Sequence, residues 1–130
     1  MSVGIREATP DDSLGVRRVL DAAMLDVRDD LETRIETGDV LVAAEGGPIL
    51  GALVLVPRTD GARVDAVAVR RARRGRGLGT RLVQAAAERV ARRPLVAEFD
   101  PSVRPFYESL GFEVSSVGEG RLRGVFEVET

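Results

Sequence analysis

The segment that most restricts how this chain can fold is a run of glycines and arginines, residues 74–80, which reads RGRGLGT. It follows a strand-like stretch, residues 63–69, and opens a segment in which apolar residues recur at helical spacing from Leu78 to Val90. Glycines at a strand-to-helix junction let the backbone approach a ligand closely, and the first turn of a helix offers unpaired amides and a favourable dipole. The run therefore predicts a phosphate-binding turn in an α/β domain.

Six arginines lie between Arg70 and Arg81, so this turn is strongly basic. The whole chain has a net charge of −2, whereas a nucleic-acid-binding domain is usually basic throughout. No aromatic residue lies among the arginines to stack on bases. We therefore expect one small anionic ligand and no nucleic-acid partner. An arginine-rich nucleic-acid binder is a lower-ranked alternative, and it predicts duplex binding that falls steeply with salt.

Two other glycine motifs fit the run less well. A dinucleotide-binding fingerprint has its first glycine directly after the strand and a third glycine, whereas residues 70–74 intervene here and Thr80 takes the third position. A Walker loop needs a lysine, which this chain lacks. An exposed basic loop without a ligand is the remaining alternative.

Three residue types are missing, and their absence restricts the chemistry. The chain contains no cysteine and no histidine. It also contains no lysine, because all 19 basic residues are arginines. Thiol nucleophiles, disulfides and Schiff bases are therefore excluded, and we expect no metal site. Catalysis has to use carboxylates, tyrosine, arginine, hydroxyls or backbone amides.

The length of 130 residues fits one compact domain, residues 1–130. No apolar run approaches the roughly 20 residues that a membrane span needs, and no charged leader precedes an apolar stretch at the N-terminus. We expect a cytoplasmic protein without a membrane partner. Hydrophobic patterns predict strands at residues 3–8, 40–44, 49–56, 63–69, 95–99, 112–117 and 122–128, and helices at 10–38 (a pair or one bent helix), 78–90 and 101–110.

Two landmarks in this order resemble the GNAT superfamily of N-acetyltransferases. Residues 67–69, followed by Arg74-x-x-Gly77-x-Gly79, are similar to its acyl-CoA signature, and residues 105–112 (PFYESLGF) are similar to its second landmark. The resemblance implies a GNAT fold of the α/β class: a central mixed, mostly antiparallel sheet, splayed in the middle and flanked by helices. It also implies acetyl-CoA as cosubstrate, an amine-bearing acceptor and, as in many relatives, a homodimer.

The resemblance assigns the cosubstrate contacts residue by residue. Backbone amides of residues 67–69 would bind the pantetheine arm and thioester carbonyl, and those of residues 74–80 would bind the pyrophosphate. The chain departs from the family at residues 100–104, where many relatives have asparagine and alanine, so the asparagine contact to coenzyme A is not carried over. The implied cosubstrate-binding residues are Val67, Ala68, Val69, Arg74, Gly75, Arg76, Gly77, Leu78, Gly79 and Thr80.

Three side chains are the catalytic candidates. Tyr107 falls where the family places the group that protonates or hydrogen-bonds the leaving sulfur, although its helical spacing equally fits packing in the core. Glu98 is the first choice for the base, because apolar neighbours on a strand covered on both faces would partly desolvate it. Asp65 is the second choice, and either carboxylate could act through water. Both could instead form ion pairs, for example with Arg63 or Arg104.

These features together predict direct acetyl transfer to an amine in a ternary complex, since no cysteine is available for a covalent intermediate. A non-catalytic acyl-CoA-binding module on the same fold is the alternative. Four carboxylates between residues 26 and 32 hint at a cationic acceptor, but they fit a solvated helix face equally well. They are Asp26, Asp29, Asp30 and Glu32.

Overall fold

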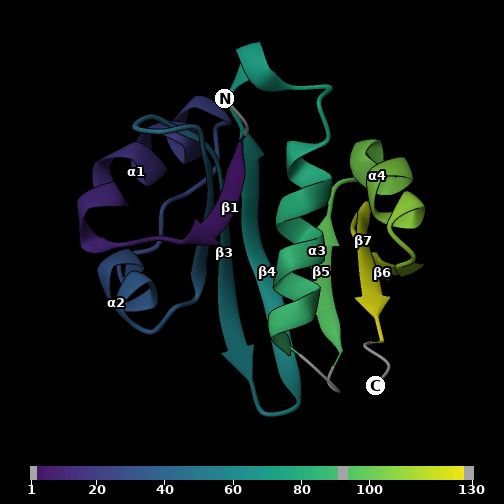
Figure 1. Cartoon of the computed structure of the whole chain (residues 1–130). Helices are drawn as coiled ribbons and strands as arrows, with labels where there is room; N and C mark the ends of the chain where they lie inside the picture. Colours follow the sequence, from purple (N-terminus) through teal and green to yellow (C-terminus); the bar gives the residue numbers. More distant parts are fainter. Residues whose placement is uncertain (1–2, 91–93, 128–130) are drawn as a thin grey trace.

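The computed structural model describes residues 3–90 and 94–127, and its centre is a seven-stranded mixed sheet (Figure 1). The strand order is β1-β2-β3-β4-β5-β7-β6, and every neighbouring pair is antiparallel except β4 and β5. The predicted sheet is thereby confirmed, while Val128 of the last predicted strand lies outside the described residues. The strands are β1 (Gly4–Glu7), β2 (Val40–Ala44), β3 (Ile49–Arg58), β4 (Gly61–Val69), β5 (Leu95–Phe99), β6 (Glu113–Gly118) and β7 (Arg121–Phe126).

Four helices cover the two faces of this sheet. The helices α1 (Ser13–Ala22) and α2 (Leu31–Glu36) pack on one face, so the sequence alternative of a helix pair is the correct one. The helices α3 (Leu78–Val90) and α4 (Arg104–Ser109) pack on the other face, with α3 lying along the sheet in Figure 1. Within the described ranges, no helix is both long enough and apolar enough to span a membrane.

A tight turn between β3 and β4 fixes where β4 begins. Thr59 and Asp60 form the turn, as the sequence predicts, and Gly61 follows with φ +124°. A Cβ on Gly61 would lie 2.1 Å from the carbonyl oxygen of Pro94, so only glycine fits here. The neighbouring amide of Ala62 donates to that same carbonyl at 3.2 Å. This close approach sets β5 beside β4.

A β-bulge interrupts β4 at Asp65. Val54 pairs with Ala66 and Leu55 pairs with Val64, so Asp65 is the extra residue between them. Because one extra residue reverses the alternation of side chains, Val64 lies in the core under α3 whereas Ala66 lies in the core under α1. The bulge therefore changes which side chains of β4 face which layer.

The parallel pairing of β4 with β5, called the seam below, is short. It consists of three residue pairs and ends at Val64 and Ala97. Beyond that point β5 continues beside β7 as far as Phe99, while residues 65–69 of β4 keep only β3 as a neighbour. The predicted splay in the middle of the sheet is confirmed. It leaves one backbone edge of β4 open.

Candidate active site

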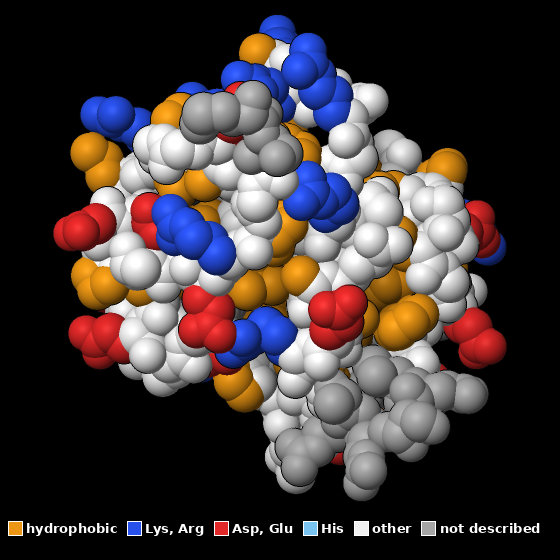
Figure 2. Space-filling view, in the orientation of Figure 1, with side chains coloured by type: hydrophobic (Ala, Val, Ile, Leu, Met, Phe, Trp, Pro, Cys, Tyr) orange, Lys and Arg blue, Asp and Glu red, His pale blue; other side chains and the backbone are white. Residues whose placement is uncertain are grey.

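A cavity of about 240 Å³ lies where β4 ends and α3 begins, next to α4. We call it the cradle. The start of α3, the loop before it and α4 lie toward the same end of the molecule (Figure 1), and basic side chains gather on the surface at that end (Figure 2). The lining residues are Val69, Arg73, Arg74, Gly75, Gly77, Leu78, Gly79, Thr80 and Phe106.

Two glycines shape the cradle through their backbone conformation. Gly75 and Gly77 both have φ +78°, which side chains of L-residues rarely adopt, although a Cβ on either would meet no atom within 4 Å. The carbonyl of Gly77 accepts the first hydrogen bond of α3, from the amide of Arg81 at 3.0 Å. The first-turn amides of α3 therefore have no partner within the helix and lie beside the cavity. This geometry suits a bound phosphate.

Arginines brace the loop and add charge around it. Arg70 donates to the carbonyl of Ile49 at 2.7 Å, and Arg74 donates to the carbonyl of Val69 at 3.1 Å. These contacts tie the loop to the ends of β3 and β4. Arg71 and Arg76 are exposed, so their guanidinium groups add positive potential at the rim.

The structure brings together most of the residues that the sequence assigned to the cosubstrate. Val67, Ala68 and Arg76 do not line the cradle, and the side chain of Leu78 is in the core, so that residue offers only its backbone. Two lining residues were missed, Arg73 and Phe106. Arg73 belongs to the arginine run, and Phe106 precedes the tyrosine of the second landmark, so both carried a signal. The cosubstrate contacts themselves stay a prediction.

Tyr107 is buried in a cluster of aromatic rings. Its ring stacks on Phe99 with 4.2 Å between centroids and contacts Phe106 and Phe112 edge-on. Burial raises the pKa of the Tyr107 phenol to about 12. The group is therefore a protonated hydrogen-bond donor over the whole physiological range. The packing expected as one alternative is present, and its role at the leaving sulfur stays a prediction.

Glu98 is exposed, so the expectation that it is partly buried is wrong. The other four residues of β5 are buried, as expected for an apolar strand. Helices α1 and α2 contact β3 and β4, and within the described ranges no helix covers this face over β5 and β7. Glu98 pairs at 3.0 Å with Arg123, directly opposite on β7, rather than with Arg63 or Arg104.

Asp65 forms ion pairs with two arginines. Its Oδ1 lies 3.1 Å from Arg63 and 3.4 Å from Arg28, which comes from the loop between α1 and α2. Arg28 also pairs with Asp30 at 2.8 Å, and its hydrogen bond lowers the pKa of the Asp30 carboxyl. Asp30 in turn approaches Arg34 at 3.7 Å. The second candidate base is thus one member of a chain of alternating charges that runs from Arg63 to Arg34.

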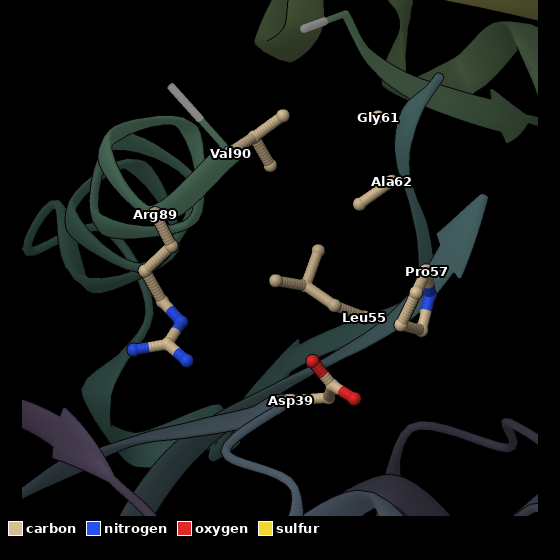
Figure 3. A pocket seen from close by; sticks show the side chains of 7 residues that line it. All are labelled: Asp39, Leu55, Pro57, Gly61, Ala62, Arg89 and Val90. Carbon is tan, nitrogen blue, oxygen red and sulfur yellow. The ribbon is translucent and has the colours of Figure 1, made fainter. Parts of the chain in front are cut away.

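A larger cavity, of about 360 Å³, lies near the opposite end of α3 (Figure 3). The side chains of Asp39 and Arg89 point toward the space beside Leu55 in this view. Each already has a partner of opposite charge, since Asp39 pairs with Arg34 and Arg89 pairs with Glu7. None of the predicted site residues lines this cavity. The phosphate-binding geometry places the candidate active site at the cradle and the open edge of β4.

A family model described as an acetyltransferase (GNAT) domain matches residues 36–114, more than half of the chain. The chain belongs to the GNAT family. The match includes β4, the cradle, β5 and Tyr107, so both landmarks quoted above lie within it. A search of curated proteins finds no match.

Solved structures share this GNAT fold along nearly the whole chain. Ard1 from Thermoplasma volcanium has a TM-score of 0.83 and 19% identity, with 100% of both chains covered. PaiA N-acetyltransferase from Thermoplasma acidophilum, in complex with coenzyme A, has a TM-score of 0.80 and 14% identity, with 98% of this chain and 99% of that chain covered.

A longer enzyme contains the same fold as one part. N-acetylglutamate synthase from Neisseria gonorrhoeae, complexed with coenzyme A and L-arginine, has a TM-score of 0.82 and 18% identity. The alignment covers 98% of this chain and 34% of that one, so the chain spans about a third of the synthase. Among the described residues, no group of three or more carboxylates is placed to hold a metal ion.

Proposed function

We propose that this GNAT protein is an acetyl-CoA-dependent N-acetyltransferase that transfers the acetyl group directly to an amine. The observation that carries the proposal is the position of the cradle. A glycine-lined cavity at the first turn of α3 adjoins the open edge of β4, so one elongated ligand can use both. Coenzyme A has this form, with a pyrophosphate at one place and amide groups further along its arm.

Each part of the cosubstrate has a matching group in the chain. The first-turn amides of residues 78–80 would hold the pyrophosphate, with Arg73 and Arg74 supplying charge. In the described part of the chain, the backbone of residues 66–69 has no neighbouring strand on the β5 side. Its free groups would form hydrogen bonds with the amides of the pantetheine arm. Phe106 would close the cavity from α4. The thioester would then lie near the end of the seam.

The chemistry at the thioester follows from the groups near that point. A backbone amide of β4 would stabilise the oxyanion that forms when the amine attacks the carbonyl carbon. Tyr107 would donate a hydrogen bond to the leaving sulfur. A phenol with a pKa of about 12 keeps its proton beside a thiolate, whose conjugate thiol has a pKa of about 8.5 in cysteine. The attacking nitrogen gives its proton to a base, and water carries a proton on to the thiolate, so the step balances.

Glu98 remains our first choice to accept the proton of the amine. It is open to solvent and has one cationic partner, Arg123. Asp65 is more enclosed and already lies between two guanidinium groups, so it is less accessible to a substrate amine. A water molecule would complete the path from the amine to Glu98.

Isothermal titration with acetyl-CoA tests the proposal first. We expect saturable binding that Gly77→Val or Gly79→Val weakens by about 100-fold or more, or about 2.7 kcal/mol. Gly47→Val is the matched control, because Gly47 lies in the turn between β2 and β3 and a Cβ there meets no atom within 4 Å. Absence of binding by the wild type, or binding that Gly77→Val leaves intact, contradicts the proposal.

Thiol release in the presence of amines tests catalysis separately from binding. Tyr107→Phe keeps the aromatic packing and removes only the hydroxyl, so we expect kcat to fall by about 10- to 1,000-fold while the Kd for acetyl-CoA changes little. If the chain binds acetyl-CoA but releases no thiol with any amine, the result would contradict the proposed enzymatic activity and support the alternative of a non-catalytic coenzyme A-binding module.

A further inference from the structure

Among the described residues, the helices α1 and α2 do not extend over β5 and β7 on the face of the sheet opposite α3, and the strand register shows which side chains lie there. Arg63 of β4 is level with Val96 of β5, which is level with Val125 of β7. One step further, Glu98 is level with Arg123. We call these five side chains, with Asp65, the bare face. Val96 is buried and Val125 is half-buried, and the charged groups lie at the end where the seam opens.

Two arginine side chains beside β4 are more exposed to solvent than Asp65, the carboxylate with which both pair. Arg28 reaches from the α1–α2 loop to Asp65, which Arg63 approaches from β4. Asp65 is only 17% exposed, whereas Arg28 and Arg63 are 32% and 35% exposed. The single contact of Arg63 with Asp65 occupies part of a guanidinium that has five N–H donors. Arg28 already uses three of its donors on Asp30 and Asp65, so Arg63 offers more donors to a ligand on this face than Arg28 does.

The carboxylates that hinted at a cationic acceptor are partly engaged elsewhere. Glu32 accepts hydrogen bonds from Arg17 and Ser13, and these lower its pKa to about 2. Asp30 is held by Arg28 and Arg34. Asp26 and Asp29 are exposed on the loop. Half of the expected acidic set thus forms internal ion pairs and does not offer charge to a substrate.

Building on the proposed function, we infer that the acetyl acceptor is a small amine that carries a carboxylate, bound by Arg63 and Arg28 on the bare face. Asp65 and Glu98 follow the last pair of the seam, Val64 and Ala97, so this face adjoins the place proposed for the thioester. A guanidinium pairs with a carboxylate through two parallel hydrogen bonds, which fixes orientation as well as charge. The amine would then lie toward Glu98, and the half-buried Val125 would accept a short apolar segment.

Matched pairs of amines test this inference with the whole chain. The probes are L-glutamate with L-glutamine, L-aspartate with L-asparagine, and L-leucine with L-leucinamide, each with acetyl-CoA. We expect kcat/KM for the preferred pair to be higher for the member with the extra carboxylate by about 10-fold or more. Arg63→Gln and Arg28→Gln should each remove most of that preference, and Arg63→Lys should restore part of it.

The control is Arg18→Gln, which changes the net charge equally on an exposed part of α1. It should keep the preference, and all four variants should keep the wild-type Kd for acetyl-CoA, which shows that the fold is intact. Binding of the same pairs to the coenzyme A-saturated chain, by titration calorimetry, gives a readout without turnover. Carboxylate-selective binding that Arg63→Gln abolishes supports the inference even if no acetyl transfer occurs, in which case the proposed function fails alone.

Three results overturn the inference, whether or not the chain transfers an acetyl group. The first is equal use or binding of both members of every pair. The second is a carboxylate preference that survives both Arg63→Gln and Arg28→Gln. The third is absence of binding for every probe. Preference for the members that lack the extra carboxylate would also overturn the inference and point instead to Glu98 and Asp65 as the groups that select a cationic acceptor.

Discussion

The side chain of Tyr107 packs in the core and, in the proposed mechanism, also donates a hydrogen bond. Its ring fills an aromatic cluster with Phe99 and Phe112, and Gly124 makes room for that cluster, since a Cβ there would lie 3.1 Å from both phenylalanine rings. Its hydroxyl has to reach a sulfur atom if the proposed mechanism is correct. Burial favours the neutral phenol, so packing and hydrogen-bond donation support each other.

This side chain can be titrated without interference. It is the only tyrosine, and the chain has no tryptophan, so near-ultraviolet absorbance of phenolate reports Tyr107 alone. We expect the folded pKa near 12 and, in denaturant, a value near the ordinary 10.0. Because the folded pKa is raised, the associated stability is complete below pH 10 and is lost as the pH rises toward 12. A folded-state midpoint near 10 would show that the phenol is solvated.

The two carboxylates show what a residue pattern can and cannot predict. The sequence identified Glu98 as the one polar residue in an apolar strand, and the other four residues are indeed buried. Its own exposure depends on the lack of a helix over β5 and β7, which is a property of distant elements. The partner Arg123 is 25 residues away in sequence and adjacent only through the β5–β7 register. Local spacing cannot supply that register.

At the scale of elements, α1 and α2 are joined by a surface contact. Glu32, in the first turn of α2, accepts hydrogen bonds from Arg17 and from Ser13 of α1 at 2.6 and 2.7 Å. The apolar contacts of Val16, Val19, Leu31 and Ile35 lie beneath it. Since the contact is exposed, it is weaker than the packing below, but it positions the loop that carries Arg28.

The stability that Glu32 contributes should depend on pH in a defined window. Its pKa is lowered from 4.5 to about 2, so the contribution is present above pH 4.5 and is lost as the pH falls toward 2. We expect Glu32→Gln to lower the free energy of unfolding at neutral pH and the difference from wild type to shrink across that window. Denaturant melts at several pH values measure it. Glu36→Gln on the same helix is the control, and an equal pH dependence for both would refute the assignment.

The elements themselves were largely predictable, and the bulge was not. Strand and helix periodicity, with turns at residues 45–48 and 59–61, gave the strands, α3 and α4 to within a few residues, whereas residues 23–30, inside the range predicted as helical, form a loop between α1 and α2. Residues 62, 64, 66 and 68 of β4 are all small and apolar, so the sequence looks like one uninterrupted strand. Alanine and valine fit either face, which is why the reversal at Asp65 leaves no trace in the pattern.

At the scale of the whole molecule, the sheet consists of two antiparallel parts joined by the seam. Strands β1–β4 form one part and β5–β7 the other, and three residue pairs connect them. We expect acetyl-CoA at about 100 times its Kd to stabilise the fold by about 2.7 kcal/mol. Hydrogen exchange should slow most at residues 66–69, and Gly77→Val should show neither effect. Stabilisation without protection of β4 would place the ligand elsewhere.

The short seam also bears on how the two parts of the sheet are held together. Three ladder pairs are a narrow joint, and α3, which contacts strands of both antiparallel parts, also holds them together. A ligand bound along the open edge of β4 would fill the space beside the last pair of the seam and would therefore affect how the two parts are held. The cosubstrate would then set the angle between the two parts, and with it the distance between Arg63 and Arg123 across the bare face. Occupancy of the cradle would in this way prepare the surface on which the second substrate binds.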